Sequence, residues 1–149
     1  MVKKNSMQSW LEAGYNQFAA EGLEGIQVER LARITGLNKS GYYHYFGDRE
    51  TYLEKLMENH LLISGYMANG LKLVQHFDPQ FIEVLLKYAT PVMAHNQLVR
   101  NRDNKLLVRT YNKVNEIVDP IVSQLFADFI GFKDHLDFST RYYYQIRDT

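Results

Sequence analysis

The segment from Val28 to Arg49, VERLARITGLNKSGYYHYFGDR, carries the residues whose types and spacing are best suited to chemistry. It divides into two short helical patterns on either side of Gly36. Gly36 predicts a tight turn, because glycine adopts positive φ at little cost. Asn38 is a favourable N-cap for the second helix. Two short helices around such a turn are typical of a helix-turn-helix, whose second helix enters the major groove of duplex DNA.

The second helix of this pair has two chemically different sides. Tyr42 and Phe46 are four residues apart, so we expect both to face inward. The outward side then carries a cation, a hydroxyl, a phenol and an imidazole, from Lys39, Ser40, Tyr43 and His44. Such groups bind phosphates and the edges of bases. The alternative is an ordinary solvated face, but the aromatic side chains beside a lysine favour contact with DNA.

The rest of the chain also has helical periodicity, and only three prolines interrupt it. We expect a first helix that ends at Gly22, a second over 28–35, and a long fourth helix capped by Asp48. Further on, Asp78–Pro79 predicts a helix start, and Pro91 should kink or split that helix. Asp119–Pro120 predicts another start, which separates a helix over 106–118 from one that ends at Gly131. A final helix should begin near Lys133.

The predicted fold is all-α. Residues 1–48 form a three-helix head that contains the helix-turn-helix and binds DNA, and a long helix joins it to a helical body over 49–149. The body is the candidate ligand-binding and dimerisation domain. The aromatic run Tyr142–Tyr144 with Ile146 spreads apolar surface around most of the last helix, which suggests a partner subunit there. Packing against the chain's own body is the alternative.

Composition excludes several classes of protein. Hydrophobic residues make up 46% of the chain, yet no apolar run approaches the ~18 residues of a membrane helix. There is no cysteine and no signal peptide, so we expect a cytoplasmic protein without a membrane partner. Phosphate-binding glycine loops, nucleophile elbows and zinc-protease pairs are absent from the sequence, so we expect no enzyme. The five histidines show no i,i+3 or i,i+4 pairing, which predicts neither a metal site nor a cofactor.

Net charge gives no support to nucleic-acid binding. The chain has 17 basic and 17 acidic residues, and its first sixty residues hold seven Lys and Arg against eight Asp and Glu. DNA-binding proteins are often strongly basic, because neutralising phosphates supplies much of their affinity. The interpretation therefore depends on where individual charges lie.

Taken together, the first helix, Gly22, the helix over 28–36, the run from Gly36 to Phe46 and Asp48-Arg49-Glu50 resemble the DNA-binding head of TetR-type (TetR/AcrR) regulators. The resemblance covers about the first sixty residues. It implies a homodimer that reads a palindromic operator on double-stranded DNA. It also implies an effector site for a small molecule in the helical body, and a dimer contact formed by the last two helices.

The resemblance also implies roles for individual residues. Tyr43 and His44, joined by Tyr45, match positions whose rings lie against the DNA backbone and base edges, and Arg49 matches a residue that binds a phosphate. The full set of matched DNA-binding positions is Gln27, Lys39, Ser40, Gly41, Tyr43, His44, Tyr45 and Arg49.

Two of these positions depart from the family pattern, and so does the length. Gln27 stands where threonine usually caps the second helix, and Gly41 stands where threonine is frequent. Family members usually continue for about another helix beyond the position of Thr149. The resemblance therefore implies either a longer native protein or a minimal dimer contact.

For the body, aromatic and polar residues at helical spacing are candidates for lining an effector pocket, although at this spacing they are more often plain core. The candidates are Tyr66, Phe81, Tyr88, His95, Tyr111 and Phe126. Two interpretations of function follow from the sequence. The first is a ligand-responsive transcriptional repressor. The second is a helical adaptor or ligand-binding protein that has lost DNA binding.

Overall fold

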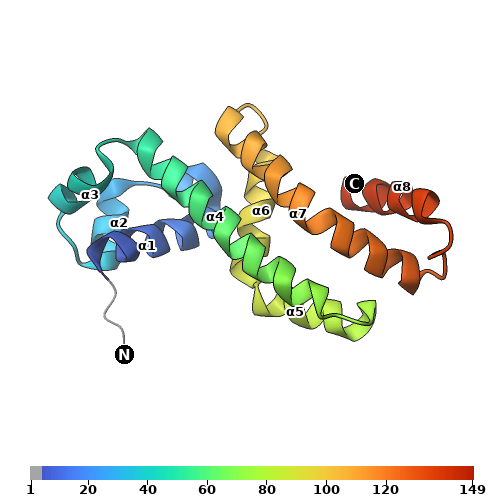
Figure 1. Cartoon of the computed structure of the whole chain (residues 1–149). Coiled ribbons are helices and arrows are strands. Elements are labelled where there is room, and N and C mark those ends of the chain that lie inside the picture. The colour runs from blue at the N-terminus through green and yellow to red at the C-terminus, as the bar shows by residue number, and fades with distance from the viewer. Residues whose placement is uncertain (1–4) are drawn as a thin grey trace. The chain divides into compact units, whose positions relative to one another are not determined.

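The computed structural model describes residues 5–149, which contain eight α-helices and no strand (Figure 1). The predicted all-α fold is therefore confirmed. No helix in this part of the chain combines the length and the apolar character needed to cross a membrane.

The chain divides into two compact units. The first consists of the described part of Met1–Leu62 together with Thr90–Tyr111, and the second of Ile63–Ala89 together with Asn112–Thr149. Two helices, α4 (Arg49–Lys72) and α7 (Lys105–Phe129), contribute residues to both units. The division predicted at residue 48, between a DNA-binding head and a regulatory body, is a functional one and stays a prediction.

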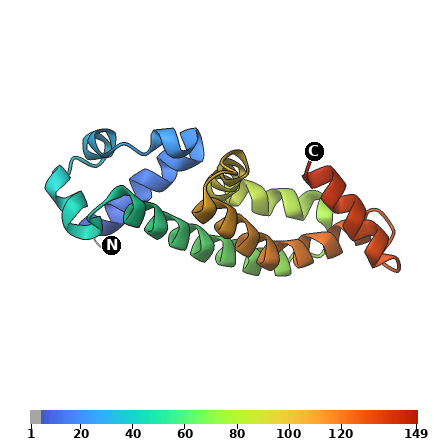
Figure 2. The ribbon, with the colours of Figure 1, turned by 90° about the horizontal axis from the view of Figure 1, so that it is seen from above.

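The first unit begins with a three-helix arrangement. It contains α1 (Ser6–Glu21), the 3₁₀ turn η1 (Gly22–Gly25), α2 (Val28–Thr35) and α3 (Lys39–Phe46), followed by the start of α4 (Figure 2). Gly22 ends α1 with a φ of 72°, as expected from the sequence. Both α1 and α2 end at the residues that the sequence predicts, because a glycine follows each of them.

An aromatic cluster joins α1, α3 and α4 in this unit. We define it as Trp10, Tyr42, Phe46 and Tyr52, all at most 4% exposed. The Tyr42 ring lies 5.6 Å from that of Trp10 and 4.9 Å from that of Tyr52. The Tyr52 hydroxyl donates to the Trp10 carbonyl at 2.6 Å. A methyl group on Gly14 would lie 1.8 Å from that hydroxyl, so the close approach of α1 and α4 requires glycine there.

The first unit also contains α6 (Ala89–Arg100), except for its first residue, Ala89, which belongs to the second unit. The sequence predicts that Pro91 kinks or splits a helix, and the structure confirms a split. A five-residue turn, η2 (Phe77–Phe81), and α5 (Ile82–Lys87) precede the break, which lies at Tyr88. Asp78 is extended and Pro79 opens the helical run that continues into α5, as the prediction of a helix start at Asp78–Pro79 requires.

The expected helix start at Asp119–Pro120 is wrong. Helix α7 runs from Lys105 to Phe129 without a break, with Pro120 inside it. Val114, Val122 and Phe126 are buried at intervals of four or eight residues, so one apolar stripe continues past the exposed proline. Packing of that stripe outweighs the loss of one backbone hydrogen bond.

The second unit packs aromatic side chains from η2 against the end of α7. The ring of Phe77 lies 4.6 Å from that of Phe81 and 5.0 Å from that of Phe129. Helix α8 (Leu136–Arg147) begins three residues after the predicted start and is held to α7 by an ion pair between Arg147 and Asp119. The end of α7 at Phe129 is followed by Gly131 at a φ of 76°, as the sequence predicts.

The aromatic cluster offers a matched test of one hydrogen bond. Tyr52→Phe removes the donor to Trp10, so we expect the free energy of unfolding to fall by about 1 kcal/mol. Tyr42→Phe removes a buried hydroxyl that has no hydrogen-bond partner within residues 5–149, so it should leave stability unchanged or raise it. Chemical unfolding of both variants measures the difference, and equal losses would contradict the account.

Candidate nucleic-acid interface

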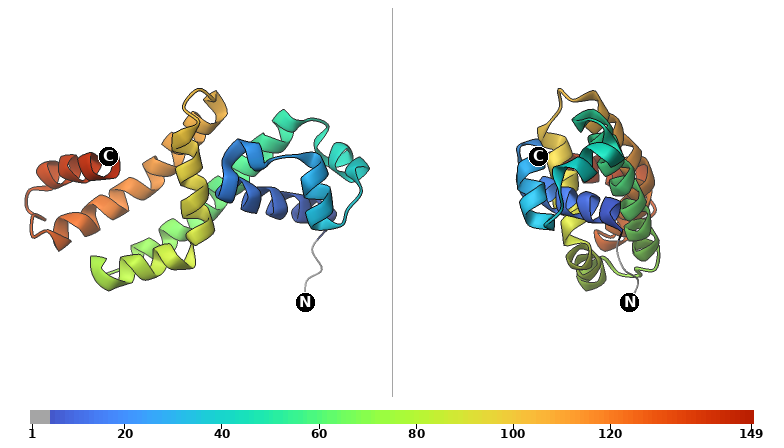
Figure 3. Two further views of the ribbon diagram at one scale, coloured as in Figure 1. Left: turned by 180° about the vertical axis from the view of Figure 1, so that it is seen from behind. Right: turned by 90° about the vertical axis from the view of Figure 1, so that its left-hand side faces the viewer.

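The turn between α2 and α3 is fixed by two backbone devices. Gly36 is left-handed, with φ 69° and ψ 14°, and its N–H donates to the Ala32 carbonyl at 2.9 Å. The Asn38 side chain then accepts from the Ser40 N–H at 3.0 Å, which starts α3. Both were expected from the sequence, and together they set the direction in which α3 leaves the turn (Figure 3, right).

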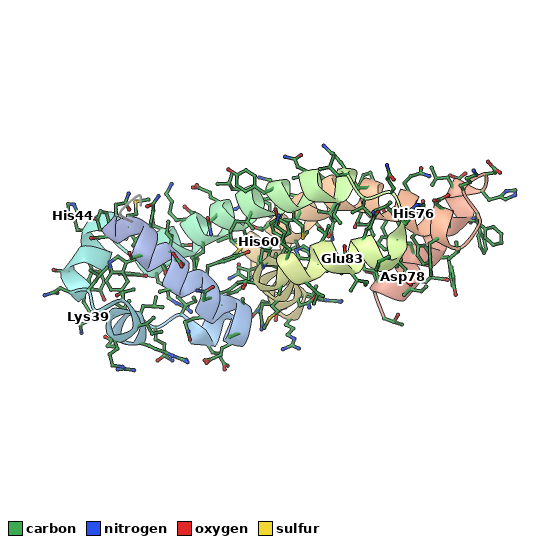
Figure 4. All side chains as sticks on the ribbon, turned by 90° about the horizontal axis from the view of Figure 1, so that it is seen from below. Lys39, His44, His60, His76, Asp78 and Glu83 are labelled. Atoms are coloured by element: carbon green, nitrogen blue, oxygen red, sulfur yellow. The ribbon has the colours of Figure 1, made fainter. Side chains whose placement is uncertain are left out.

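Helix α3 has the two sides that its sequence predicts. Tyr42 and Phe46 are 1% and 4% exposed and belong to the aromatic cluster, which turns the opposite side outward. Figure 4 shows Lys39 and His44 on the outer surface of this unit. We call the exposed side chains of Lys39, Ser40, Tyr43, His44 and Tyr45 the reading face.

Three further positions implied by the resemblance surround the reading face. Gln27 occupies the N-cap of α2 but makes no capping bond, and its amide donates to the Glu24 carbonyl at 3.2 Å. Gly41 is half-buried, and a methyl group there would lie 3.5 Å from Trp10 Nε1, an ordinary contact. Arg49 is exposed and donates to the Leu23 carbonyl at 2.9 Å, so it ties the start of α4 to η1.

Two cations of the first unit, Lys39 and Arg30, form ion pairs with carboxylates, which the sequence alone did not indicate. Lys39 lies 3.4 Å from Glu29, a residue of α2 ten positions earlier. Arg30 makes a two-point pair with Glu21 at 2.5 and 2.6 Å. Hydrogen bonding to Arg30 lowers the pKa of Glu21, while that of Glu29 is lowered first by a backbone N–H and then by Lys39. Both pairs are solvent-exposed, so water weakens them.

The residues predicted to line an effector pocket fall into both units. Tyr66, Phe81, Tyr88 and Phe126 belong to the second unit, where Tyr66 is 57% exposed and Phe126 is buried. His95 and Tyr111 belong to the first, and their rings stack at 4.9 Å. An effector pocket lined by these residues stays a prediction.

Sequence reasoning missed a buried histidine in the first unit. His60 is fully buried, accepts or donates at 2.7 Å with the Tyr15 hydroxyl, and lies 3.3 Å from His95. The two histidines are 35 positions apart, so spacing within one helix could not reveal the pair. Across residues 5–149 no three His, Cys, Asp or Glu side chains gather as metal ligands would, and this includes the labelled His76, Asp78 and Glu83 (Figure 4).

The capped turn, the buried side of α3 and its exposed polar side define the first unit as one that contains a helix-turn-helix of the DNA-binding type. Residues 11–56 match the family described as bacterial regulatory proteins, tetR family. The likeness to this family is that of the N-terminal segment, which contains the helix-turn-helix.

Two similar proteins are both named HTH-type transcriptional repressor AcnR, one from Corynebacterium efficiens and one from Corynebacterium glutamicum. Each is 44% identical over 46 residues, which are 31% of this chain and 24% of the relative. The matched segment thus spans about a quarter of the length of these relatives. No solved structure matches the chain.

The cap of α3 can be tested without DNA. Asn38→Ala leaves the Ser40 N–H without its acceptor, so we expect the free energy of unfolding to fall by about 1 kcal/mol. Asn38→Asp retains an acceptor and should restore most of that stability. Chemical unfolding measures both variants, and an alanine variant as stable as the parent would show that the cap does not hold the turn.

Proposed function

We propose that the chain is a sequence-specific DNA-binding transcriptional repressor that presents the reading face of α3 to the major groove. The observation that carries the proposal is the separation of α3 into a buried aromatic side and an exposed side of hydrogen-bonding groups. The match of residues 11–56 to a family of bacterial regulators supports it. So does the likeness of this segment to two proteins named as transcriptional repressors.

Within this proposal, the reading-face residues and the three positions around them each have a chemical role. Lys39 and Arg49 supply positive charge to phosphates, and Gln27 lies at the start of α2 where it reaches a phosphate. Ser40, Tyr43, His44 and Tyr45 hydrogen-bond or pack against base edges and the sugar–phosphate backbone. The half-buried Gly41 lets the helix backbone approach the duplex.

The operator in this proposal is palindromic, and two copies of the chain bind it with their α3 helices about 34–36 Å apart. Helix α8 supports a dimer, because large apolar side chains on it are exposed: Leu136, Phe138, Tyr142, Tyr144 and Ile146. In this proposal the helical body has two states that differ in operator affinity. A small-molecule effector that binds one state more tightly than the other shifts the chain toward that state and so changes operator affinity.

A second function, a helical adaptor without DNA binding, has one specific observation in its favour. Lys39 and Arg30 form ion pairs with Glu29 and Glu21. The first sixty residues also carry eight acidic side chains against seven basic ones. Such a surface attracts phosphates weakly.

Selection of bound duplexes from a random pool separates the two functions. The full chain should enrich a palindrome. On that duplex, Lys39→Ala should reduce the slope of log affinity against log salt by about one, and Tyr43→Ala should weaken binding by about 1–3 kcal/mol. Lys113→Ala is the matched control, since it removes an exposed cation of the second unit. Recovery of no sequence, or equal effects of all three variants, would favour the adaptor.

The pairing of Lys39 with Glu29 generates a separate prediction. Glu29→Gln frees Lys39 for phosphate, so we expect duplex affinity to rise by about two- to five-fold. Glu24→Gln removes the same charge from an exposed position of η1 and is the control for long-range electrostatics. Equal gains from both substitutions, measured by titration at one salt concentration, would mean that the Lys39–Glu29 contact has no influence of its own.

A further inference from the structure

Two glycines lie beside the aromatic cluster, and only one of them is required by packing. A methyl group on Gly14 would lie 1.8 Å from the Tyr52 hydroxyl, so α1 needs glycine there. At Gly41 the backbone is ordinary helix, and a methyl group would make a normal contact at 3.5 Å. Glycine destabilises a helix interior relative to alanine, and α3 has only eight residues. The fold alone therefore does not explain glycine at position 41.

The contact that a methyl group would make at Gly41 is with the nitrogen of a buried indole. Apart from the chain neighbours of Gly41 and the backbone of α3, Trp10 Nε1 is the one heavy atom of residues 5–149 within 4 Å of the methyl position. The two ring carbons bonded to Nε1 therefore lie farther from that position, so the N–H side of the indole faces it. We call the space between Gly41 and Trp10 Nε1 the Gly41 gap.

The indole N–H has no acceptor in the part of the chain that the structure describes. The Trp10 side chain is 0% exposed, and no residue from 5 to 149 accepts a hydrogen bond from its Nε1. An indole N–H can only donate, and a buried one usually has an acceptor. Nε1 is not one of the unpartnered polar atoms that are sealed from solvent, so a group outside the chain can reach it.

We propose that the Gly41 gap is a site for one phosphate group of the duplex, and that Trp10 donates its indole N–H to an oxygen of that phosphate. The inference rests on the proposed function, because the reading face must lie on DNA for a phosphate to reach the gap. A phosphate oxygen supplies the acceptor that the indole lacks, and its charge strengthens the hydrogen bond. Gly41 is half-buried at the margin of the exposed reading face, where the backbone that borders the groove lies.

The start of α3 also favours an anion at this place. Gly41 is the third residue of the helix, and the first turn carries no acidic side chain. The positive end of the helix dipole therefore adds to the attraction for a phosphate. The N–H groups of Ser40 and Gly41 already donate to the side chain and the carbonyl of Asn38. The hydrogen bond to the phosphate thus comes from Trp10 and not from these amides.

Trp10 is the single tryptophan of the chain, so its indole N–H gives one resonance in the NMR spectrum of the full chain labelled with nitrogen-15. Addition of the duplex recovered by selection should move this resonance downfield together with the amides of α3. In Gly41→Ala a methyl group lies between Nε1 and the phosphate, so the indole resonance should stay in place. The same variant should bind the duplex about ten-fold more weakly, because a charge-assisted hydrogen bond is lost.

The stability of Gly41→Ala separates this loss from misfolding. Alanine favours a helix, so the midpoint of chemical unfolding should rise while duplex affinity falls. Gly65→Ala is the matched control, since Gly65 lies in α4 within the second unit and a methyl group there would meet nothing within 4 Å. It should gain stability as Gly41→Ala does and bind the duplex like the parent.

A second pair of variants tests the hydrogen bond from the side of the indole. Trp10→Phe removes the N–H, so it should weaken duplex binding in the parent. In Gly41→Ala the same substitution should cost little further affinity, because the contact is already lost. If Trp10→Phe does not fold, the indole resonance and Gly41→Ala still decide the inference.

Modified duplexes identify the acceptor. Neutral methylphosphonates, placed one at a time along the duplex, should reveal one position that weakens binding of the parent but not that of Gly41→Ala. If this difference instead follows replacement of a guanine by 7-deazaguanine, the acceptor is a base edge and the assignment to phosphate is overturned.

The outcomes separate the inference from the proposed function. Amides of α3 that shift while the indole resonance stays in place would overturn the inference and leave the proposed function intact. Equal duplex affinity of the parent, Gly41→Ala and Gly65→Ala would do the same. Failure of every duplex to bind would overturn both.

Discussion

Burial of Tyr42 and Phe46 in the aromatic cluster is the constraint on which the rest of the first unit depends. Helix α3 has only eight residues, too few to be stable alone in water, so its orientation comes from packing on Trp10 and Tyr52. Once two residues four apart are buried, helical geometry turns Lys39, Ser40, Tyr43 and His44 toward solvent. The groups that α3 exposes are thus set by the core beneath it, and Gly14 permits that core by letting α4 approach α1.

The charge distribution suggests how such a face can select a sequence. A strongly basic surface binds any duplex through its phosphates, whereas specificity comes from contacts with base edges and from DNA shape. Here Lys39 and Arg30 already form ion pairs with carboxylates. Apart from Lys39, the reading face consists of a hydroxyl, two phenols and an imidazole. Under the proposed function, non-specific affinity is low and discrimination between sequences depends on these four hydrogen-bonding groups. In that proposal, Glu29 and Glu21 would limit binding at wrong sites, at some cost to affinity at the correct one.

Local signals predicted the parts of the fold that local chemistry determines. Gly36 and Asn38 set the turn and start of α3 because positive φ and N-capping are properties of single residues. Pro91 was predicted to break a helix and does, but Pro120 did not break α7, because the buried stripe of Val114, Val122 and Phe126 continues past it. Sequence spacing could not reveal contacts between distant helices, such as Lys39 with Glu29 or His60 with His95. The roles of the reading-face residues remain predictions.

The most direct test of the central claim is to titrate the isotope-labelled full chain with the duplex recovered by selection and to follow backbone amide shifts by NMR. The account predicts that the largest changes fall on Lys39–Phe46, with smaller ones at Gln27 and Arg49 and none of that size in α5. Shifts that leave α3 unchanged while another helix responds would contradict the assignment of the reading face.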